Sequence, residues 1–96
     1  MKIEVTARHF DASDKIRDYA IEKVSKIRRY FNNPINCRVI LSRENDEHIA
    51  EINLFIAGNQ IFVKESSDNM FKSIDGAVDK LVVRVKKFKT KRYAHT

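Results

Sequence analysis

The chain contains few of the residues that build covalent cross-links, metal sites or nucleotide-binding loops. Among 96 residues there are one cysteine, one proline, two glycines and no tryptophan. The single cysteine, Cys37, excludes an internal disulfide and any metal site made of several thiolates. Gly58 and Gly76 lie too far apart to form a glycine-rich phosphate loop. We therefore predict no cofactor and no metal site.

Long apolar runs are also missing. The longest are only a few residues, whereas a helix that spans a bilayer needs about 20. Glu4 and Arg8 interrupt the apolar residues at the N-terminus, so no signal-peptide core is present there. The composition, 43% apolar and 33% charged, is typical of a folded soluble protein. We expect a single domain over residues 1–96, located in the cytoplasm.

Positive charge is concentrated at the C-terminal end. The formal net charge is +6, from 19 Lys and Arg against 13 Asp and Glu. Seven of the basic residues and none of the acidic ones lie from residue 80 onward, so residues 1–79 hold 12 basic and 13 acidic side chains. A localised excess of this kind is typical of a surface that meets a polyanion, either nucleic acid or an anionic membrane.

The first part of the chain has the pattern of a strand followed by a helix. Residues 2–7 alternate apolar and polar side chains, which predicts a strand. Asp11 or Ser13 is expected to cap a helix whose apolar side chains recur at helical spacing as far as Phe31. Pro34, after two asparagines, is expected to end it.

The rest of the chain predicts three strands and a long helix. The strand-like runs are residues 37–41, 48–57 and 60–66. The helix is expected to start at Ser67 or Asp68 as its cap, and its apolar residues step by three and four from Phe71 to Phe88. The basic run from Lys80 onward therefore belongs to this helix.

Gly58-Asn59 predicts a tight hairpin between the last two strands. With these two residues as the turn, residue 57 faces residue 60 and Phe55 lies opposite Phe62. The side chains that then share the core face are Ile52, Leu54, Ile56, Ile61 and Val63.

The predicted order of elements is β-α-β-β-β-α. The first strand, helix and second strand form a right-handed crossover between parallel strands, and the remaining strands form an antiparallel meander. Each helix has one apolar face, so both are expected to cover the same face of a four-stranded mixed sheet. The fold class is therefore α+β.

The basic residues of the last helix form a stripe. Four of them fall within about 60° of one another around the helix axis, namely Lys80, Arg84, Lys87 and Lys91. Earlier in the helix the same sector holds Ser73 and Gly76, whose small side chains would admit a bulky partner. Val83 is apolar although it lies on the outward side of this helix, and the sequence pattern gives no physical reason for its position.

Three interpretations of the stripe remain open from the pattern alone. Lysines near a helix C-terminus are stabilised by the helix dipole, so the stripe can be an ordinary solvated face. It can also bind nucleic acid or an anionic membrane. Lys23 and Lys26 of the first helix are expected to extend the stripe across the groove between the helices, which would give a surface shaped for phosphates.

Other polar residues give no sign of catalysis. The three histidines have no metal-ligand spacing, and Cys37 is expected in the core. Asp75 and Asp79 are interpreted as solvated carboxylates. Phe55 and Phe62 either stack nucleic-acid bases, pair with each other across the strands, or contact a second copy of the chain. We predict no enzymatic activity and no small-molecule substrate.

Three segments resemble the ribosome hibernation promoting factor family, which includes ribosome-associated inhibitor A and sigma-54 modulation proteins. The segments are IRDYAIEKVSKIRRYF at 16–31, VILSRE at 39–44 and MFKSIDGAVDKL at 70–81. They occur in the family's order, and the resemblance extends over essentially the whole chain. The resemblance implies a β-α-β-β-β-α fold similar to double-stranded RNA-binding domains.

The resemblance also implies a function. Members of the family bind the small (30S) ribosomal subunit in stationary phase or stress, contact 16S rRNA, and block the mRNA channel and the A- and P-site tRNA positions. The chain is similar to the short form, without a C-terminal dimerisation domain, which in some bacteria acts with a ribosome modulation factor in forming ribosome dimers. A general double-stranded RNA-binding module is the alternative. A membrane is not expected as partner, because the helix uses its apolar face in the core.

Matching positions give the residues expected to contact rRNA. They are Arg17, Lys23, Lys26, Lys80, Arg84, Lys87 and Lys91. Three further cations are second-rank candidates: Lys86, Lys89 and Arg92. Phe71 stands where the family often has tyrosine, so the ring is kept and the hydroxyl is absent.

Overall fold

The computed structural model describes residues 1–31, 36–56 and 58–94, with side chains described as far as residue 89. Within these residues the strands are β1 (Lys2–Arg8), β2 (Asn36–Glu44), β3 (Glu47–Ile56) and β4 (Asn59–Ser67). The helices are α1 (Asp14–Ser25), a 3₁₀ segment η1 (Lys26–Tyr30) and α2 (Met70–Ala94). The predicted order β-α-β-β-β-α is confirmed.

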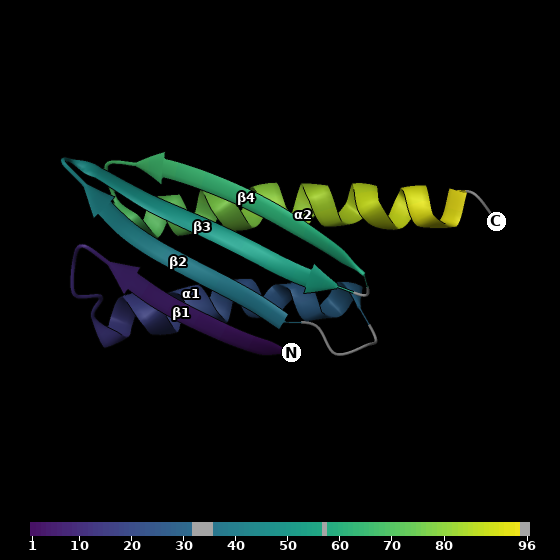
Figure 1. The fold of residues 1–96 in the computed structure, drawn as a ribbon, viewed down its shortest axis with the longest axis horizontal. Helices are drawn as coiled ribbons and strands as arrows, with labels where there is room; N and C mark the ends of the chain where they lie inside the picture. Colours follow the sequence, from purple (N-terminus) through teal and green to yellow (C-terminus); the bar gives the residue numbers. More distant parts are fainter. Residues whose placement is uncertain (32–35, 57, 95–96) are drawn as a thin grey trace.

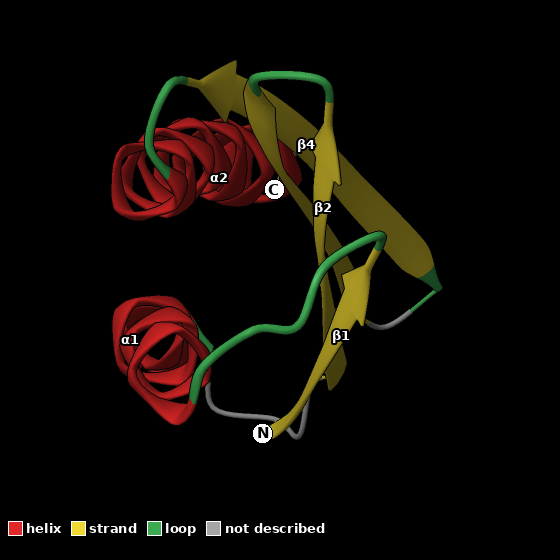
Figure 2. Ribbon diagram, turned by 90° about the vertical axis from the view of Figure 1, so that its left-hand side faces the viewer, coloured by secondary structure: helices red, strands yellow, loops and turns green. Residues whose placement is uncertain are grey.

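The strands form one mixed sheet in the order β1-β2-β3-β4 (Figure 1). β1 is parallel to β2, and the other neighbouring pairs are antiparallel, as predicted. In the described part of the chain β1 and β4 are therefore the edge strands. Both helices lie on one face of the sheet (Figure 2), with α1 against β1 and α2 against β3 and β4. The opposite face, called the outer face below, carries no helix.

The core lies between the sheet and the two helices. Alternate strand residues point into it because successive side chains of a strand face opposite sides. The predicted core residues of the hairpin, from Ile52 to Val63, are all buried. On α2 the buried positions include Ile74, Val78, Leu81 and Val85, as the spacing predicts.

The first helix is shorter than predicted. Ser13 is its cap, since its hydroxyl accepts a hydrogen bond from the Ile16 amide at 3.2 Å. The α-helix ends at Ser25 and tightens into η1, which keeps Ile27 buried. A step of three residues suits a 3₁₀ turn as well as an α-helix, so the apolar spacing could not distinguish them. The predicted stop at Pro34 lies outside the described residues.

The predicted hairpin register is wrong by two residues. Ile56 pairs with Asn59, and Phe62 lies opposite Asn53 instead of Phe55. Gly58 has a φ of +72°, which favours glycine in a turn, and Asn59 already belongs to β4. A shift of two residues leaves every side chain on the same face. The apolar pattern is therefore satisfied by both registers, and only the turn geometry separates them.

The second helix begins later than predicted. Its cap is Asn69, whose side-chain oxygen accepts hydrogen bonds from the Phe71 and Lys72 amides at 2.8 and 3.3 Å. Neither Ser67 nor Asp68 takes this place. The 25 residues of α2 span about 37 Å at 1.5 Å per residue. The C-terminal part of the helix runs past the end of the sheet (Figure 1).

Candidate nucleic-acid interface

Lys80 and Arg84 lie along the free edge of β4. The Lys80 ammonium donates to the Lys64 carbonyl at 3.1 Å, and the Arg84 guanidinium donates to the Phe62 carbonyl at 3.4 Å. Phe62 and Lys64 are two residues apart, so their carbonyls point to the same side of the strand. The stripe therefore covers a sheet edge. Each cation has several N–H donors, and one bond to the edge leaves others for an external acceptor.

Ser73 and Gly76 do not admit an external partner, contrary to the prediction. Ser73 is fully buried, and its hydroxyl donates to the His48 carbonyl at 2.6 Å. A Cβ on Gly76 would lie 2.8 Å from Cγ and Oε2 of Glu65. The small residues therefore accommodate the protein's own sheet. The sequence did not show this because the angular position on a helix does not say what packs against it.

One acidic residue of β4 accompanies the stripe. Glu65 faces α2, and its Oε1 lies 3.4 Å from Nζ of Lys80. The stripe contains no acid along the helix, but the sheet supplies one at its N-terminal end. Lys80 therefore has an acidic neighbour inside the protein, and its charge is partly neutralised.

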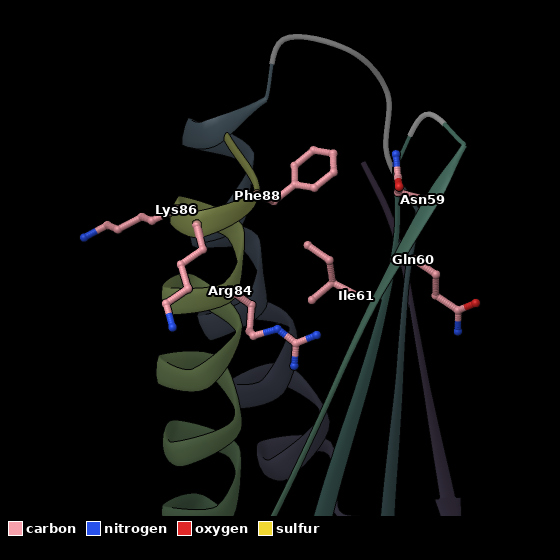
Figure 3. A pocket seen from close by; sticks show the side chains of 7 residues that line it. Asn59, Gln60, Ile61, Arg84, Lys86 and Phe88 are labelled. Carbon is pink, nitrogen blue, oxygen red and sulfur yellow. The ribbon is translucent and has the colours of Figure 1, made fainter. Parts of the chain in front are cut away.

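Two hollows lie between α2 and β4, and Arg84 lines both. The first, near the β3–β4 turn, has a volume of about 540 Å³ and includes Ile61, Lys87 and Phe88 in its lining. In Figure 3, Arg84 reaches from the helix toward the strand, while Lys86 points away from the hollow. The second has about 510 Å³, and its lining residues are Phe62, Val63, Lys64, Asp79, Lys80, Val83 and Arg84.

Lysine and arginine side chains are among the residues that line both hollows. We call the set of Lys64, Lys80, Arg84 and Lys87 the β4-edge surface. Lys64 was not predicted, although strand alternation from Val63 places it on the outer face beside Phe62. Among the residues that line the second hollow, Asp79 is the one carboxylate.

The other candidate cations lie elsewhere. The Arg17 guanidinium donates to the Val5 carbonyl at 3.0 Å, beside β1 at the opposite end of the strand order. Lys26 is exposed in η1. Lys91 belongs to α2, but its side chain is outside the described residues, as is that of Arg92. The structure therefore brings three of the seven predicted residues together, namely Lys80, Arg84 and Lys87.

Lys23 does not join the stripe across the helix groove. Its Nζ lies 4.0 Å from Oδ1 of Asp75 and 5.3 Å from the centre of the Tyr19 ring. Asp75 is on the side of α2 that faces α1, whereas Lys80 and Arg84 face β4. Lys89 faces η1, where its ammonium donates to the Tyr30 carbonyl at 2.5 Å. Both lysines thus have partners inside the protein.

Asp75 connects the helices and is not simply solvated. The Tyr19 hydroxyl donates to its Oδ1 at 2.6 Å. This hydrogen bond, with a smaller contribution from burial, raises the pKa of Tyr19 above its usual value. The Tyr19 ring also meets Phe71 edge-on at 5.0 Å between centres. Phe71 therefore has a packing role between the helices.

The outer face of the sheet is mixed in character. Cζ of Arg38 lies 5.9 Å from the centre of the Phe55 ring. Nε of Arg38 also lies 3.8 Å from Oε2 of Glu4. The Asn53 and Gln60 side chains hydrogen-bond at 2.6 Å. They occupy one diagonal between β3 and β4, while Phe55 and Phe62 occupy the other. The prediction that Phe55 lies directly opposite Phe62 is therefore wrong.

The described residues show no metal-binding group of three His, Cys, Asp or Glu side chains. Cys37 is buried in β2, and burial raises the pKa of its thiol to about 12. It is therefore a neutral core thiol. In the part of the chain that the structure describes, no helix is both long enough and apolar enough to cross a membrane.

A family model described as sigma 54 modulation protein / S30EA ribosomal protein matches residues 3–93. The chain is 28% identical over 92 residues to the ribosome hibernation promoting factor of Pseudomonas putida, covering 96% of this chain and 90% of that protein. It is 28% identical over 95 residues to that of Klebsiella oxytoca, covering 99% and 100%.

Two solved structures are similar over most of their length. The N-terminal domain of Thermus thermophilus protein Y has a TM-score of 0.85 and 32% identity, covering 92% of this chain and 99% of that one. A ribosomal subunit interface protein from Coxiella burnetii has a TM-score of 0.83 and 26% identity, covering 94% and 99%. These similarities extend from the first strand into the basic helix.

Proposed function

Because the chain belongs to the sigma 54 modulation protein / S30EA ribosomal protein family, we propose that it is a hibernation factor that binds the 30S subunit through 16S rRNA. The resemblance drawn from its sequence segments is confirmed by the family match and by the curated relatives. In this role it occupies the mRNA channel and the A- and P-site tRNA positions in stress or stationary phase. It acts in the cytoplasm, where ribosomes are, as a single ribosome-binding domain and without a catalytic step.

The β4-edge surface is the observation that carries the proposal. Lys80, Arg84 and Lys87 are placed along one side of a rigid helix, so their spacing is fixed before binding. Lysine and arginine contacts to phosphates position a protein on RNA without reading its sequence. The molecule is also elongated, with extents of 47 × 21 × 18 Å. An elongated body held by phosphate contacts excludes mRNA and tRNA by its volume.

Salt dependence provides the first test. If six to eight phosphates are contacted, the slope of log affinity against log salt is about −4 to −7. The measurement is co-sedimentation with purified 30S subunits over a series of salt concentrations. Binding that is insensitive to salt contradicts the proposed phosphate contacts.

Charge reversal on the C-terminal half of α2 tests the site. Replacing both Lys87 and Lys91 with glutamate is expected to weaken 30S binding strongly and to make the slope about two units less negative. The fold should survive, because Lys87 is exposed. Lys15→Glu, an exposed position on α1, is the control for charge alone. Unchanged co-sedimentation of the double variant contradicts the assignment of these residues.

A short RNA duplex separates this function from general double-stranded RNA binding. Such modules recognise the shape of A-form RNA and its 2′-hydroxyls. The proposed factor should prefer 30S subunits strongly over a plain duplex at the same salt concentration. Equal affinity for both would favour the general RNA-binding module.

Addition of the protein to a cell-free translation reaction should also lower the yield of translated protein.

A further inference from the structure

Exposed apolar side chains gather beside the cations of β4. Four large hydrophobic residues are exposed among those described, and the two most exposed are Val83 and Phe62, at 52% and 44%. Both line the second hollow, with Lys64, Lys80 and Arg84. The sequence did not explain why Val83 is apolar. In the structure this residue belongs to a site that combines apolar and positively charged side chains.

The observed hairpin register leaves the Phe62 ring uncovered by Phe55. Phe62 lies opposite Asn53, whose amide is hydrogen-bonded to Gln60 along the other diagonal. Phe55 is instead near the Arg38 guanidinium. In the predicted register the two rings would have packed against each other. In the observed register Phe62 is 44% exposed on the edge strand and lines the second hollow.

Charge complementarity identifies the occupant of this hollow. Three of its lining residues are cationic, and Asp79 is its one carboxylate, so a partner that combines phosphates with an apolar plane fits both parts of the lining. A nucleotide with an unpaired base has this chemistry. Bases inside a duplex hide their faces by stacking, whereas an unpaired base can stack on an aromatic ring.

A second copy of the chain fits the edge less well. Strand addition needs free backbone groups along β4. The carbonyls of Phe62 and Lys64 instead accept hydrogen bonds from Arg84 and Lys80. Cationic side chains on an edge strand also oppose strand pairing between copies. The cations that occupy the edge thus favour a phosphate-bearing ligand over a β-strand.

We propose that Phe62 is a stacking platform for one unpaired RNA base, with Val83 as the apolar wall beside it and Lys64, Lys80 and Arg84 holding the adjacent phosphates. This inference rests on the proposed ribosomal function and adds to it. Phosphate contacts alone do not distinguish paired from unpaired nucleotides, whereas this site requires an unpaired one. It therefore restricts binding to places where the RNA is single-stranded.

Fluorescence can report the stacking directly, because the chain contains no tryptophan. Phe62→Trp keeps a flat ring and introduces a single reporter. Addition of a 12-nucleotide single-stranded RNA should quench its emission, and the same sequence in a duplex should quench it much less. Phe55→Trp, on the same sheet face, is the matched control and should respond weakly. Equal responses of the two variants, or equal quenching by duplex, overturn the proposal.

Affinity measurements separate stacking from general apolar contact. Phe62→Ala should weaken binding to 30S subunits by about 5- to 150-fold, the range for loss of one stacked base. Its salt slope should remain that of the native protein, because no phosphate contact is lost. Phe62→Leu keeps apolar bulk without a ring and should lose nearly as much. Native-like affinity of either variant, or loss of a protein dimer in Phe62→Ala, contradicts the proposal.

The two proposals fail in different ways. If Lys87→Glu/Lys91→Glu weakens 30S binding while Phe62→Ala does not, the ribosomal function stands and the stacking site is wrong. If the native protein does not bind 30S subunits, the ribosomal function is wrong. The oligonucleotide quenching experiment then still decides whether Phe62 stacks on an unpaired base.

Discussion

Glu65 is expected to limit the affinity of the β4-edge surface for RNA. Its carboxylate lies 3.4 Å from the Lys80 ammonium, so the lysine is partly neutralised before any phosphate arrives. Glu65→Gln removes the negative charge and keeps the shape of the side chain, which therefore still fits in the space beside Gly76. We expect the variant to bind 30S subunits more tightly and with greater dependence on salt.

The magnitude follows from one additional phosphate contact. If Lys80 gains one contact, the slope of log affinity against log salt becomes steeper by about 0.7–0.9. Between 50 and 200 mM salt, this difference corresponds to roughly a threefold greater loss of affinity than in the native protein. The cost to folding is small, since Lys80 is exposed and Glu65 is half-buried, and ion pairs open to solvent contribute about 0–1 kcal/mol.

The assay is 30S co-sedimentation at four or more salt concentrations, with urea unfolding as a check on stability. Asp18→Asn makes the same change in net charge at an exposed position of α1 and serves as the control. The expected result is a steeper slope for Glu65→Gln alone. The reasoning is refuted if Glu65→Gln keeps the native slope, or if both variants shift equally, since net charge would then be the cause.

Two further predictions concern the folded state. Ser73→Ala should lower the free energy of unfolding by about 1–3 kcal/mol, because the buried hydroxyl that donates to the part-buried His48 carbonyl is removed. Urea unfolding measures this, with exposed Ser66→Ala as the control, and equal stability of the two variants would contradict it. The Cys37 thiol should resist a thiol reagent at pH 8 until the protein is unfolded. The pKa of this thiol is about 12 in the folded protein and 9.0 ordinarily. Its contribution to the free energy of unfolding is therefore complete below pH 9 and is lost as the pH rises toward 12. Alkaline unfolding of Cys37→Ala, compared with that of the native protein, tests this.

The cations of the candidate interface also stabilise the sheet. Arg17 bonds to a carbonyl of β1, and Lys80 and Arg84 bond to carbonyls of β4. Both edges of the sheet thus carry positively charged side chains, which protects edge strands from pairing with other chains. Substitution of Arg84 therefore changes an edge contact as well as an RNA contact. Lys87, which is exposed on α2, is the cleaner position for tests of binding.

Local patterns predicted the order of the elements and their buried faces, but not where each helix begins and ends. Alternation placed Ile61 and Val63 in the core, and the three- and four-residue steps of α2 identified Ile74 and Leu81 as buried. Such periodicities are properties of one strand or one helix, so they require no knowledge of neighbours. The Asn69 cap was missed because Ser67 and Asp68 have equally suitable side chains, and only the geometry of the turn selects among them.

The sequence by itself determined the order of elements, the core faces and the existence of a basic stripe on the last helix, since each follows from the period of one segment. Tertiary structure decided what the stripe faces. It placed Lys80 and Arg84 on the β4 edge, paired Lys23 with Asp75, and set the register that exposes Phe62. Those outcomes depend on which segments pack together and on the turn at Gly58, and neither is encoded in the periodicity of a single element.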